Sequence, residues 1–295
     1  MHRRRFITTV TASLPGVAAA ASPPPSPPAP AGDPLTILHL TDIHIRPEHR
    51  APERCARALA EIRRRHPEIG LVVNTGDSIY AADYANITRE RMLEQWAIWD
   101  EVVVKSLNGI PSVHCIGNHD PWWAAPEKEK DEMHGIPYVC KRLGISAPYA
   151  ASRRAGWEII TLDNSNGKLG PEQQNWLFRH LDSLPAKLPI LIASHLPILS
   201  LAGQYDGGNM GDAKPAIDKL ATRQAPVLCL SGHIHLQSSE SIWNLQLHCN
   251  GALSGYWWEP GEAGDGSYKR TPAGYAIVRI HPDGRNESTY FPLPA

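Results

Sequence analysis

Short apolar runs that end directly in metal-binding side chains recur along this sequence, and they constrain its fold more than any other feature. The clearest is Val113–Ile116, which is followed at once by Gly117-Asn118-His119-Asp120 and then by Pro121. Proline cannot continue a central strand, so this run must end in a tight turn. In α/β folds, ligands gather beyond the carboxyl ends of the strands. One amide and one imidazole cannot hold a catalytic metal alone, so the motif needs partners.

Four further runs end in the same way and supply those partners. Leu35–Thr41 ends in Asp42-Ile43-His44, where alternation puts both metal-binding groups on one side of the chain. A histidine at a strand end is usually only a satisfied polar residue, so each motif alone is weak. Because strand ends lie side by side in a sheet, the five motifs together predict one metal centre. Its seven expected donors are Asp42, His44, Asp77, Asn118, His195, His233 and His235.

Helical patterns alternate with these runs, which predicts an α/β fold. Helices are expected at about 52–66, 88–107, 171–184 and 212–220, and further strands at 157–162, 243–249, 275–280 and 287–291. Met92, Trp96, Trp99 and Val103 recur at helical spacing, so we expect them in the core. The glycine-rich stretch Gly203–Gly211 is expected to hold no regular structure and to form a mobile loop over the site.

The balance of charge excludes one class of partner. The formal net charge is −1, and no block of lysine and arginine lies near the motifs, so we expect no extended nucleic acid as a partner. The apolar content of 42% is enough for one large core or two modest ones. The mixture of carboxylate, amide and imidazole donors suits Zn, Mn or Fe better than Ca or Cu(I).

The first 34 residues are expected to lie outside the fold. Residues 1–21 combine Arg3-Arg4-Arg5, a short apolar stretch and four alanines, and they resemble a twin-arginine export signal. The apolar stretch is too short for a membrane span. Residues 22–34 contain seven prolines, which predicts an extended linker. We therefore expect a folded domain at 35–295 that is exported to the periplasm or secreted, with a formal net charge of −4 once the signal's three arginines are removed.

The five cysteines show no spacing typical of a thiolate zinc site. Most are expected to be small buried hydrophobic residues. Cys229 and Cys249 lie on apolar runs that are candidates for neighbouring strands, so they form the one candidate disulfide pair.

The five motifs, taken in order, resemble those of the calcineurin-like metallophosphoesterases. The resemblance covers residues 35 to 295 and implies a four-layer α/β/β/α sandwich of two mixed sheets with two metal ions. It implies that Asp42, His44 and His235 hold one metal, that Asn118, His195 and His233 hold the other, and that Asp77 bridges both. It also implies that His119 is a general acid outside the metal set and that Asp120 orients it.

Known chemistry agrees with this implied site. Two cations about 3.5–4 Å apart lower the pKa of a bridging water and clamp an in-line displacement at phosphorus. The leaving oxygen needs a proton, and a positioned imidazolium accelerates such a step by ~10²–10⁴-fold. The expected substrate is therefore a small phosphate ester. A hydroxide between the metals is expected to attack its phosphorus, and His119 to protonate the leaving oxygen.

Two aromatic features leave alternatives open. Gly76-Asp77-Ser78-Ile79-Tyr80 resembles the purple acid phosphatase pattern, in which the tyrosine ligates iron, but the presence of His44 favours a Tyr80 that packs nearby without ligating. The pairs Trp122-Trp123 and Trp257-Trp258, the latter after Tyr256, either form an aromatic wall for a flat leaving group or simply pack their loops.

The motif Asp42-x-His44 is more similar to the cyclic-nucleotide phosphodiesterase branch of the family than to acid phosphatases. We therefore expect a phosphodiesterase, with a phosphomonoesterase as the alternative on the same metal core. A non-catalytic binding protein on this fold would have lost a ligand or His119, and no such loss is visible. A nuclease would need a basic groove, for which the sequence gives no support.

Overall fold

Two mixed β-sheets form the centre of the molecule. The computed structural model describes residues 32–125, 130–255, 257–258 and 271–294, so the predicted signal at 1–21 and most of the linker at 22–34 lie outside the described residues. The first sheet has the order β11-β10-β1-β2-β3, and its strands are β1 Leu35–Leu40, β2 Ile69–Asn74, β3 Ser112–His114, β10 Gly274–Ile280 and β11 Asn286–Pro292. The second has the order β4-β5-β6-β7-β9-β8, and its strands are β4 Ala150–Arg154, β5 Trp157–Thr161, β6 Ile190–Ala193, β7 Val227–Ser231, β8 Ser238–Ile242 and β9 Leu245–Cys249.

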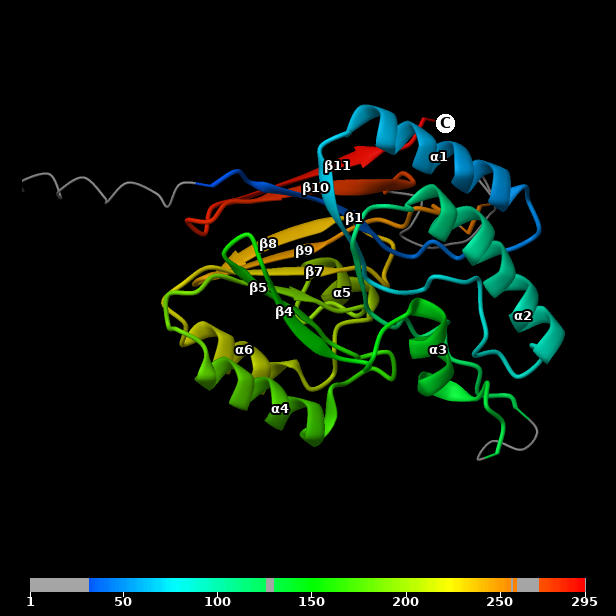
Figure 1. The fold of residues 1–295 in the computed structure, drawn as a ribbon. Coiled ribbons are helices and arrows are strands. Elements are labelled where there is room, and N and C mark those ends of the chain that lie inside the picture. Colours follow the sequence, from blue (N-terminus) through cyan, green and yellow to red (C-terminus); the bar gives the residue numbers. More distant parts are fainter. Residues whose placement is uncertain (1–31, 126–129, 256, 259–270, 295) are drawn as a thin grey trace, which may run out of the picture.

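Helices cover the outer face of each sheet (Figure 1). The first sheet packs against α1 Ala51–Arg65, α2 Arg89–Ile98, the π-helix η1 Trp99–Val104 and α3 Gly135–Leu143. The second packs against α4 Gly170–Ser183 and α6 Ala213–Ala221, and the short α5 Leu201–Asp206 lies near β8. This is the predicted α/β/β/α sandwich, which the structure confirms.

Alternation along the strands explains the layers. In β1, Ile37 points between the sheets and packs with Leu71 and Leu228, whereas Leu38 on the other face packs under the helices. Both faces of the central strands are therefore buried, which is why their sequences are almost continuously apolar. Burying each large side chain contributes about 1.5–3 kcal/mol of transfer free energy. The predicted core tryptophans Trp96 and Trp99 are 0% and 2% exposed.

Some predicted elements needed correction. Residues 203–211 were expected to hold no regular structure, but α5 takes up the first of them because the Ser200 hydroxyl caps it, accepting a hydrogen bond from Gly203 N at 3.0 Å. The candidate disulfide between Cys229 and Cys249 is wrong, since all five cysteines are free and buried. In the β7–β9 register Cys249 lies opposite Ser231, two residues along from Cys229.

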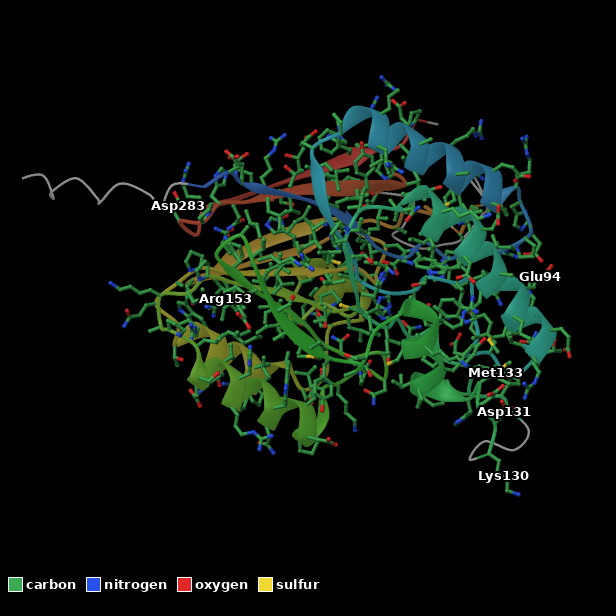
Figure 2. All side chains as sticks on the ribbon, in the orientation of Figure 1. Glu94, Lys130, Asp131, Met133, Arg153 and Asp283 are labelled. Carbon is green, nitrogen blue, oxygen red and sulfur yellow. The ribbon has the colours of Figure 1, made fainter. Side chains whose placement is uncertain are left out.

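The exposed surface carries charges of both signs. Glu94, Lys130, Arg153 and Asp283 illustrate this distribution around the molecule (Figure 2). Within the part of the chain that the structure describes, no helix combines the length and apolar character needed to cross a membrane.

Candidate metal centre

Parallel pairing brings the predicted donors to one edge of the molecule. β1 pairs parallel with β2, β2 with β3, and β6 with β7, so their carboxyl ends point the same way within each sheet. Cross-bonds between the loops that follow hold them together, with Asp42 N donating to Gly76 O at 3.0 Å and His44 N to Asp77 O at 2.9 Å. Donors from five strand ends in two sheets thus face one another.

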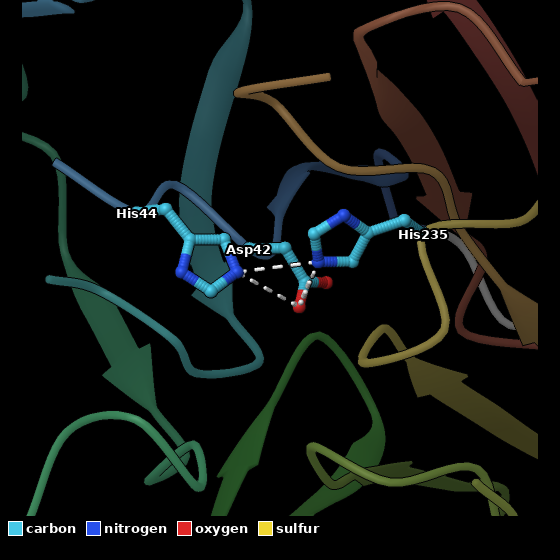
Figure 3. Close-up of side chains that lie close together, drawn as sticks. All are labelled: Asp42, His44 and His235. Carbon is cyan, nitrogen blue, oxygen red and sulfur yellow. Dashed lines mark hydrogen bonds and ion pairs between the residues drawn. The ribbon is translucent and has the colours of Figure 1, made fainter. Parts of the chain in front are cut away.

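Asp42, His44 and His235 form the first donor group (Figure 3). His44 Nε2 lies 3.2 Å from His235 Nε2, and Asp42 Oδ1 lies 3.3 Å from His235 Nε2 and 3.9 Å from His44 Nε2. The second carboxylate oxygen of Asp42 is fixed, because it accepts hydrogen bonds from the Thr41 hydroxyl at 2.7 Å and from His233 N at 2.9 Å. Asp42 Oδ1 faces the two imidazoles and accepts only a longer hydrogen bond from His233 N, at 3.2 Å.

Asp77, His195 and His233 form the second group. His195 Nε2 is the centre of its contacts, 3.2 Å from Asp77 Oδ2, 3.2 Å from His233 Nδ1 and 2.9 Å from Asn118 Oδ1. The structure therefore brings Asn118 to this group.

Asp77 lies between the two groups. Its Oδ1 accepts a hydrogen bond from His119 N at 2.9 Å, which fixes the carboxylate. Its Oδ2 lies 3.2 Å from His195 Nε2 in one group and 3.6 Å from His44 Nε2 in the other. This is the position that a ligand shared by two cations must take.

The chemistry of the donors fits cations. His44 Nδ1 lies 3.1 Å from Tyr80 O and His195 Nδ1 lies 2.9 Å from Thr75 O. Carbonyl oxygens only accept, so each Nδ1 carries a proton and each neutral Nε2 presents a lone pair to the centre. Lone pairs of His195, Asp77 and Asn118 then converge, which is unfavourable unless a positive charge lies among them.

The pKa values of the histidines in the metal-free chain reflect the same requirement for a positive charge among the donors. Burial lowers the pKa of His44 to about 3, so its ring is neutral and able to ligate. For His195, burial acts to lower the pKa, but the charge of Asp77 outweighs it and raises the pKa to about 9. A proton on His195 thus takes the place that the donor geometry offers to a metal ion.

The backbone is strained where the donors sit. Asp42, His44, Asp77, His233 and His235 all have positive φ, between 44° and 73°, which non-glycine residues seldom adopt. The loops also approach closely: a Cβ at Gly232 would overlap Thr41 Oγ1 and Asp42 Oδ2, and one at Gly117 would overlap Asp77. These two glycines of the motifs are therefore required by the close approach of neighbouring loops.

His119 lies beside the donors, but its partner is not the predicted one. His119 Nδ1 lies 2.7 Å from Asp83 Oδ1. Asp120, expected to orient this ring, instead accepts hydrogen bonds from Ser78 N at 2.8 Å and Gly117 N at 2.8 Å. The Asp120 carboxylate therefore links the loop that carries Asp77 to the loop that carries Asn118. The prediction that Asp120 orients His119 is corrected to a structural role.

The charges around His119 favour its imidazolium form. Burial acts to lower the pKa of His119, but the nearby Asp77 charge and the hydrogen bond with Asp83 outweigh it and raise the pKa. Burial and the charge of Asp77 raise the pKa of Asp120 to about 7, against the effect of the backbone N–H groups that it accepts.

The four tryptophans with open roles divide between the two alternatives. Trp122 and Trp258 are 3% exposed and hold their loops, with their indole N–H groups donating to Ile87 O and Ile43 O. Trp123 is 41% exposed and contacts His134. Trp257 alone of the four stacks on a donor, His44, at 4.3 Å between ring centroids. Tyr256, which precedes it, lies outside the described residues.

Tyr80 contributes to the site in two ways. Its carbonyl accepts from His44, as described above, and its ring packs against Trp257, Tyr84 and the Arg46 guanidinium. That its hydroxyl does not ligate a metal stays a prediction.

Comparison with known proteins decides the family. Residues 35–237 match the family model of the calcineurin-like phosphoesterases. The chain belongs to this family. Calcineurin-like phosphoesterases use dinuclear metal centres, which agrees with the two donor groups found here, and the chain is a metal-dependent phosphoester hydrolase.

Two curated relatives carry more specific names. A probable cyclic nucleotide phosphodiesterase of Synechococcus sp. is 27% identical over 271 residues, covering 86% of this chain and 91% of the relative. A probable glycerophosphodiester phosphodiesterase of Arcobacter nitrofigilis is 24% identical over 221 residues, covering 71% and 75%.

Solved structures confirm the fold. A dimetal phosphatase from Danio rerio superposes with a TM-score of 0.57 at 12% identity, covering 88% of this chain and all of the other. GAP50 of Plasmodium, described as the anchor in the inner membrane complex, gives a TM-score of 0.57 at 14% identity, covering 88% and 84%.

Proposed function

We propose that this chain is an exported phosphodiesterase in which two metal ions are bound by the seven predicted donors. The observation that carries the proposal is the position of Asp77 Oδ2 between two donor groups, with the centroid of the His119 ring 5.3 Å from that of His44. Asp42, His44 and His235 would bind one ion, Asn118, His195 and His233 the other, and Asp77 both. When bound, two such ions supply a low-pKa water nucleophile and neutralise charge on the phosphate.

The remaining steps belong to the protein's own side chains. Asp42 and Asp77 accept hydrogen bonds from the Thr41 hydroxyl and from the backbone N–H groups of His233 and His119, so Asp42 Oδ1 and Asp77 Oδ2 face the centre before any substrate arrives. Such preorganisation avoids reorganisation during the reaction.

His119 would protonate the leaving oxygen. Its Nδ1 is occupied by Asp83, which leaves Nε2 as the nitrogen that can donate. The carboxylate fixes the ring orientation and stabilises the imidazolium, as an orienting carboxylate does in other acid–base pairs. This acid matters most when the leaving group is a poor one, such as an alkyl alcohol.

A substrate panel with metal analysis tests the proposal. The full chain, loaded with Mn²⁺, Fe²⁺ or Zn²⁺, is assayed on monoesters and diesters, including cyclic nucleotides and glycerophosphodiesters. We expect two metal ions per chain and a higher kcat/KM for diesters. The names of both curated relatives support this preference. Hydrolysis of monoesters alone would replace it by a phosphomonoesterase.

Two variants separate binding from catalysis. Asp77→Ala should lose both metal ions, because its carboxylate contacts both groups. His119→Ala should retain most of the metal and lose activity on alkyl esters. Wild-type metal content in Asp77→Ala would contradict the shared ligand, and full activity of His119→Ala on an alkyl ester would contradict the acid.

Export is supported by the sequence of residues 1–34 alone. A twin-arginine-type signal carries folded protein, which would suit metal loading before export. Replacing Arg4 and Arg5 by lysine should leave the protein in the cytoplasmic fraction, while the unchanged chain is found in the periplasm or the medium. Equal export of both chains would contradict the signal.

A further inference from the structure

A short segment after β9 is fastened to the strand end that carries the first donors. The Ser254 hydroxyl donates to Asp42 O at 2.8 Å, and the Trp258 indole N–H donates to Ile43 O at 2.8 Å. Trp258 is buried, whereas Trp257 beside it is partly exposed. Both tryptophans have positive φ, 50° and 72°. Two consecutive strained residues persist only where the surroundings hold them, and such strain gathers at functional sites.

This fastening places Trp257 against several rings of the site. Its indole stacks on His44 with an interplanar angle of 12°, and its centroid lies 5.2 Å from that of His119 and 5.0 Å from that of Tyr80. Tyr84, which is 39% exposed, meets the other rings edge-on, with centroids 5.3 Å from His119 and 6.4 Å from Tyr80. We call Trp257, Tyr80 and Tyr84 the aromatic wall.

The aromatic wall flanks the group that would protonate the leaving oxygen. A proton donor must lie within about 3 Å of that oxygen, so the first atoms of the leaving group lie next to His119. Two rings of the wall have centroids 5.2 and 5.3 Å from the His119 ring. The aromatic wall therefore lies directly beside the ring that would donate the proton.

The Arg46 guanidinium beside the aromatic wall limits the kind of leaving group that the wall can bind. Aromatic surfaces bind flat rings by stacking and quaternary ammonium groups by cation–π contact. Here the Arg46 guanidinium already lies 4.0 Å over the Tyr80 ring, and Arg46 Nε donates to Glu48 at 2.9 Å. That face of Tyr80 is thus already occupied by a cation, so a second cation cannot take the same position, whereas stacking of a flat ring on Trp257 does not compete with Arg46.

We propose that Trp257, with Tyr84, lines a leaving-group subsite that favours phosphate esters whose alcohol carries a flat ring, such as a nucleoside with its base, over those whose alcohol carries only an alkyl chain or a cationic group. This inference rests on the proposed function, because it places the subsite beside His119 as the acid.

Equilibrium binding tests the subsite without turnover. The probes are analogues of AMP and of ribose 5-phosphate in which a methylene group replaces the ester oxygen, so neither is cleaved. They share sugar and phosphonate and differ by the base. Stacking of a base on an aromatic ring is worth enough to change affinity by about tenfold. We expect the Mn²⁺-loaded wild type to bind the adenosine analogue about tenfold more tightly than the ribose analogue.

Three variants assign that ratio to one side chain. Trp257→Leu should bring the ratio close to one, and Trp257→Phe should keep most of it. Trp243→Leu is the matched control, since Trp243 is 71% exposed and also has a positive φ of 53°. Metal content is measured in each variant, because Trp257 stacks on His44.

The outcomes are distinguishable. An unchanged ratio in Trp257→Leu overturns the subsite, as does an equal loss of affinity for both probes, which would show that Trp257 only supports the centre. Tighter competition by glycerophosphocholine than by the adenosine analogue would also overturn it. If the loaded wild type hydrolysed no diester while the ratio still fell in Trp257→Leu, the proposed function would fail and the subsite would stand.

Discussion

Asp83 is the carboxylate that holds the ring of His119, and it lies in a loop without any regular pattern. Its Oδ1 is 2.7 Å from His119 Nδ1, and both side chains remain partly accessible. Replacing Asp83 by a neutral residue that still accepts a hydrogen bond should make His119 a weaker proton donor without changing the two metal-donor groups.

The first prediction concerns this pair. Asp83→Asn should lower kcat on an alkyl diester by roughly tenfold or more, because the imidazolium loses a stabilising charge. Activity on a p-nitrophenyl diester should change little, because that leaving group needs no proton. The measurement is kcat on both esters with metal content determined on the same samples.

Glu158→Gln is its control. Glu158 Oε1 pairs with His180 Nε2 at 2.9 Å, away from the site, so the same chemical change is made in a pair with no catalytic part. Equal losses on alkyl and aryl esters in Asp83→Asn would contradict the orienting role.

Gly232 gives the second prediction. A methyl group there would overlap Thr41 Oγ1 and Asp42 Oδ2, so Gly232→Ala should displace Asp42 and lose metal from the first donor group. Overpacking of this kind costs about 1–3 kcal/mol of unfolding free energy. Metal analysis and urea unfolding check it. Gly211→Ala, whose added Cβ would lie 3.5 Å from Gly167 O, should behave as wild type.

For single residues, the sequence predicted the metal-donor side chains well, but it did not predict the side chains that hold His119 and the donor loops in place. The donors follow apolar runs and could be recognised by that context. Asp83 could not be recognised from the sequence, because its contact with His119 depends on the path of the loop that follows Asp77. Asp120 was adjacent to His119 in sequence, yet adjacent residues point apart, and its oxygens found backbone N–H groups instead.

Among the elements, β1 carries a buried polar residue that the mechanism does not use. His39 points between the sheets, with Nε2 2.9 Å from Thr75 Oγ1 and Nδ1 2.6 Å from Asn250 Nδ2. The amide nitrogen only donates, so Nδ1 accepts and the ring is neutral. His39 thereby links the loops after β2 and β9 across the two sheets.

The third prediction is that this histidine makes the metal-free chain acid-labile. Burial lowers the pKa of His39 from 6.5 to about 3. Below pH 6.5 the unfolded chain binds a proton that the folded chain does not, so the free energy of unfolding falls as pH decreases toward 3. The loss is about 1.4 kcal/mol per pH unit for this group.

Urea unfolding between pH 6 and 4.5 tests it. His39→Gln can keep both hydrogen bonds without titrating, so its pH slope should be shallower than that of wild type by about that amount. His49→Gln, at an exposed position, is the control. An unaltered slope in His39→Gln would show that the ring is protonated in the folded chain.

The elements that escaped prediction share a physical reason. β4 and β8 are edge strands with polar, half-exposed sequences, so neither shows the apolar run by which the central strands were recognised. α3 and α5 are short helices whose boundaries depend on tertiary contacts. The buried strands, covered on both faces, were predicted well because burial alone dictates their composition.

For the whole molecule, the donor groups join two halves. Asp42, His44, Asp77 and Asn118 follow strands of the first sheet, whereas His195, His233 and His235 follow strands of the second. Each donor group contains residues from both. Metal binding should therefore oppose separation of the sheets.

The fourth prediction is that metal binding raises the thermal stability of the chain. At a free metal concentration 100-fold above Kd, each bound ion adds about 2.7 kcal/mol to the free energy of unfolding. For a chain of this size, two ions should raise Tm by roughly 10 °C. Scanning calorimetry with and without a chelator measures the shift. Asp77→Ala, which should bind neither ion, serves as the control, and a shift of wild-type size in that variant would contradict the arrangement.

The pairing of β1 has a consequence for synthesis. One neighbour of β1 is β2, close by in the chain, but the other is β10, where Leu38 lies opposite Ile277. A nascent chain emerging from the ribosome cannot flank β1 on both sides until Gly274–Ile280 has been made. The first sheet, and with it the loop that carries Asp42 and His44, should accordingly be completed late in translation, and chains released early should remain open and sensitive to proteases.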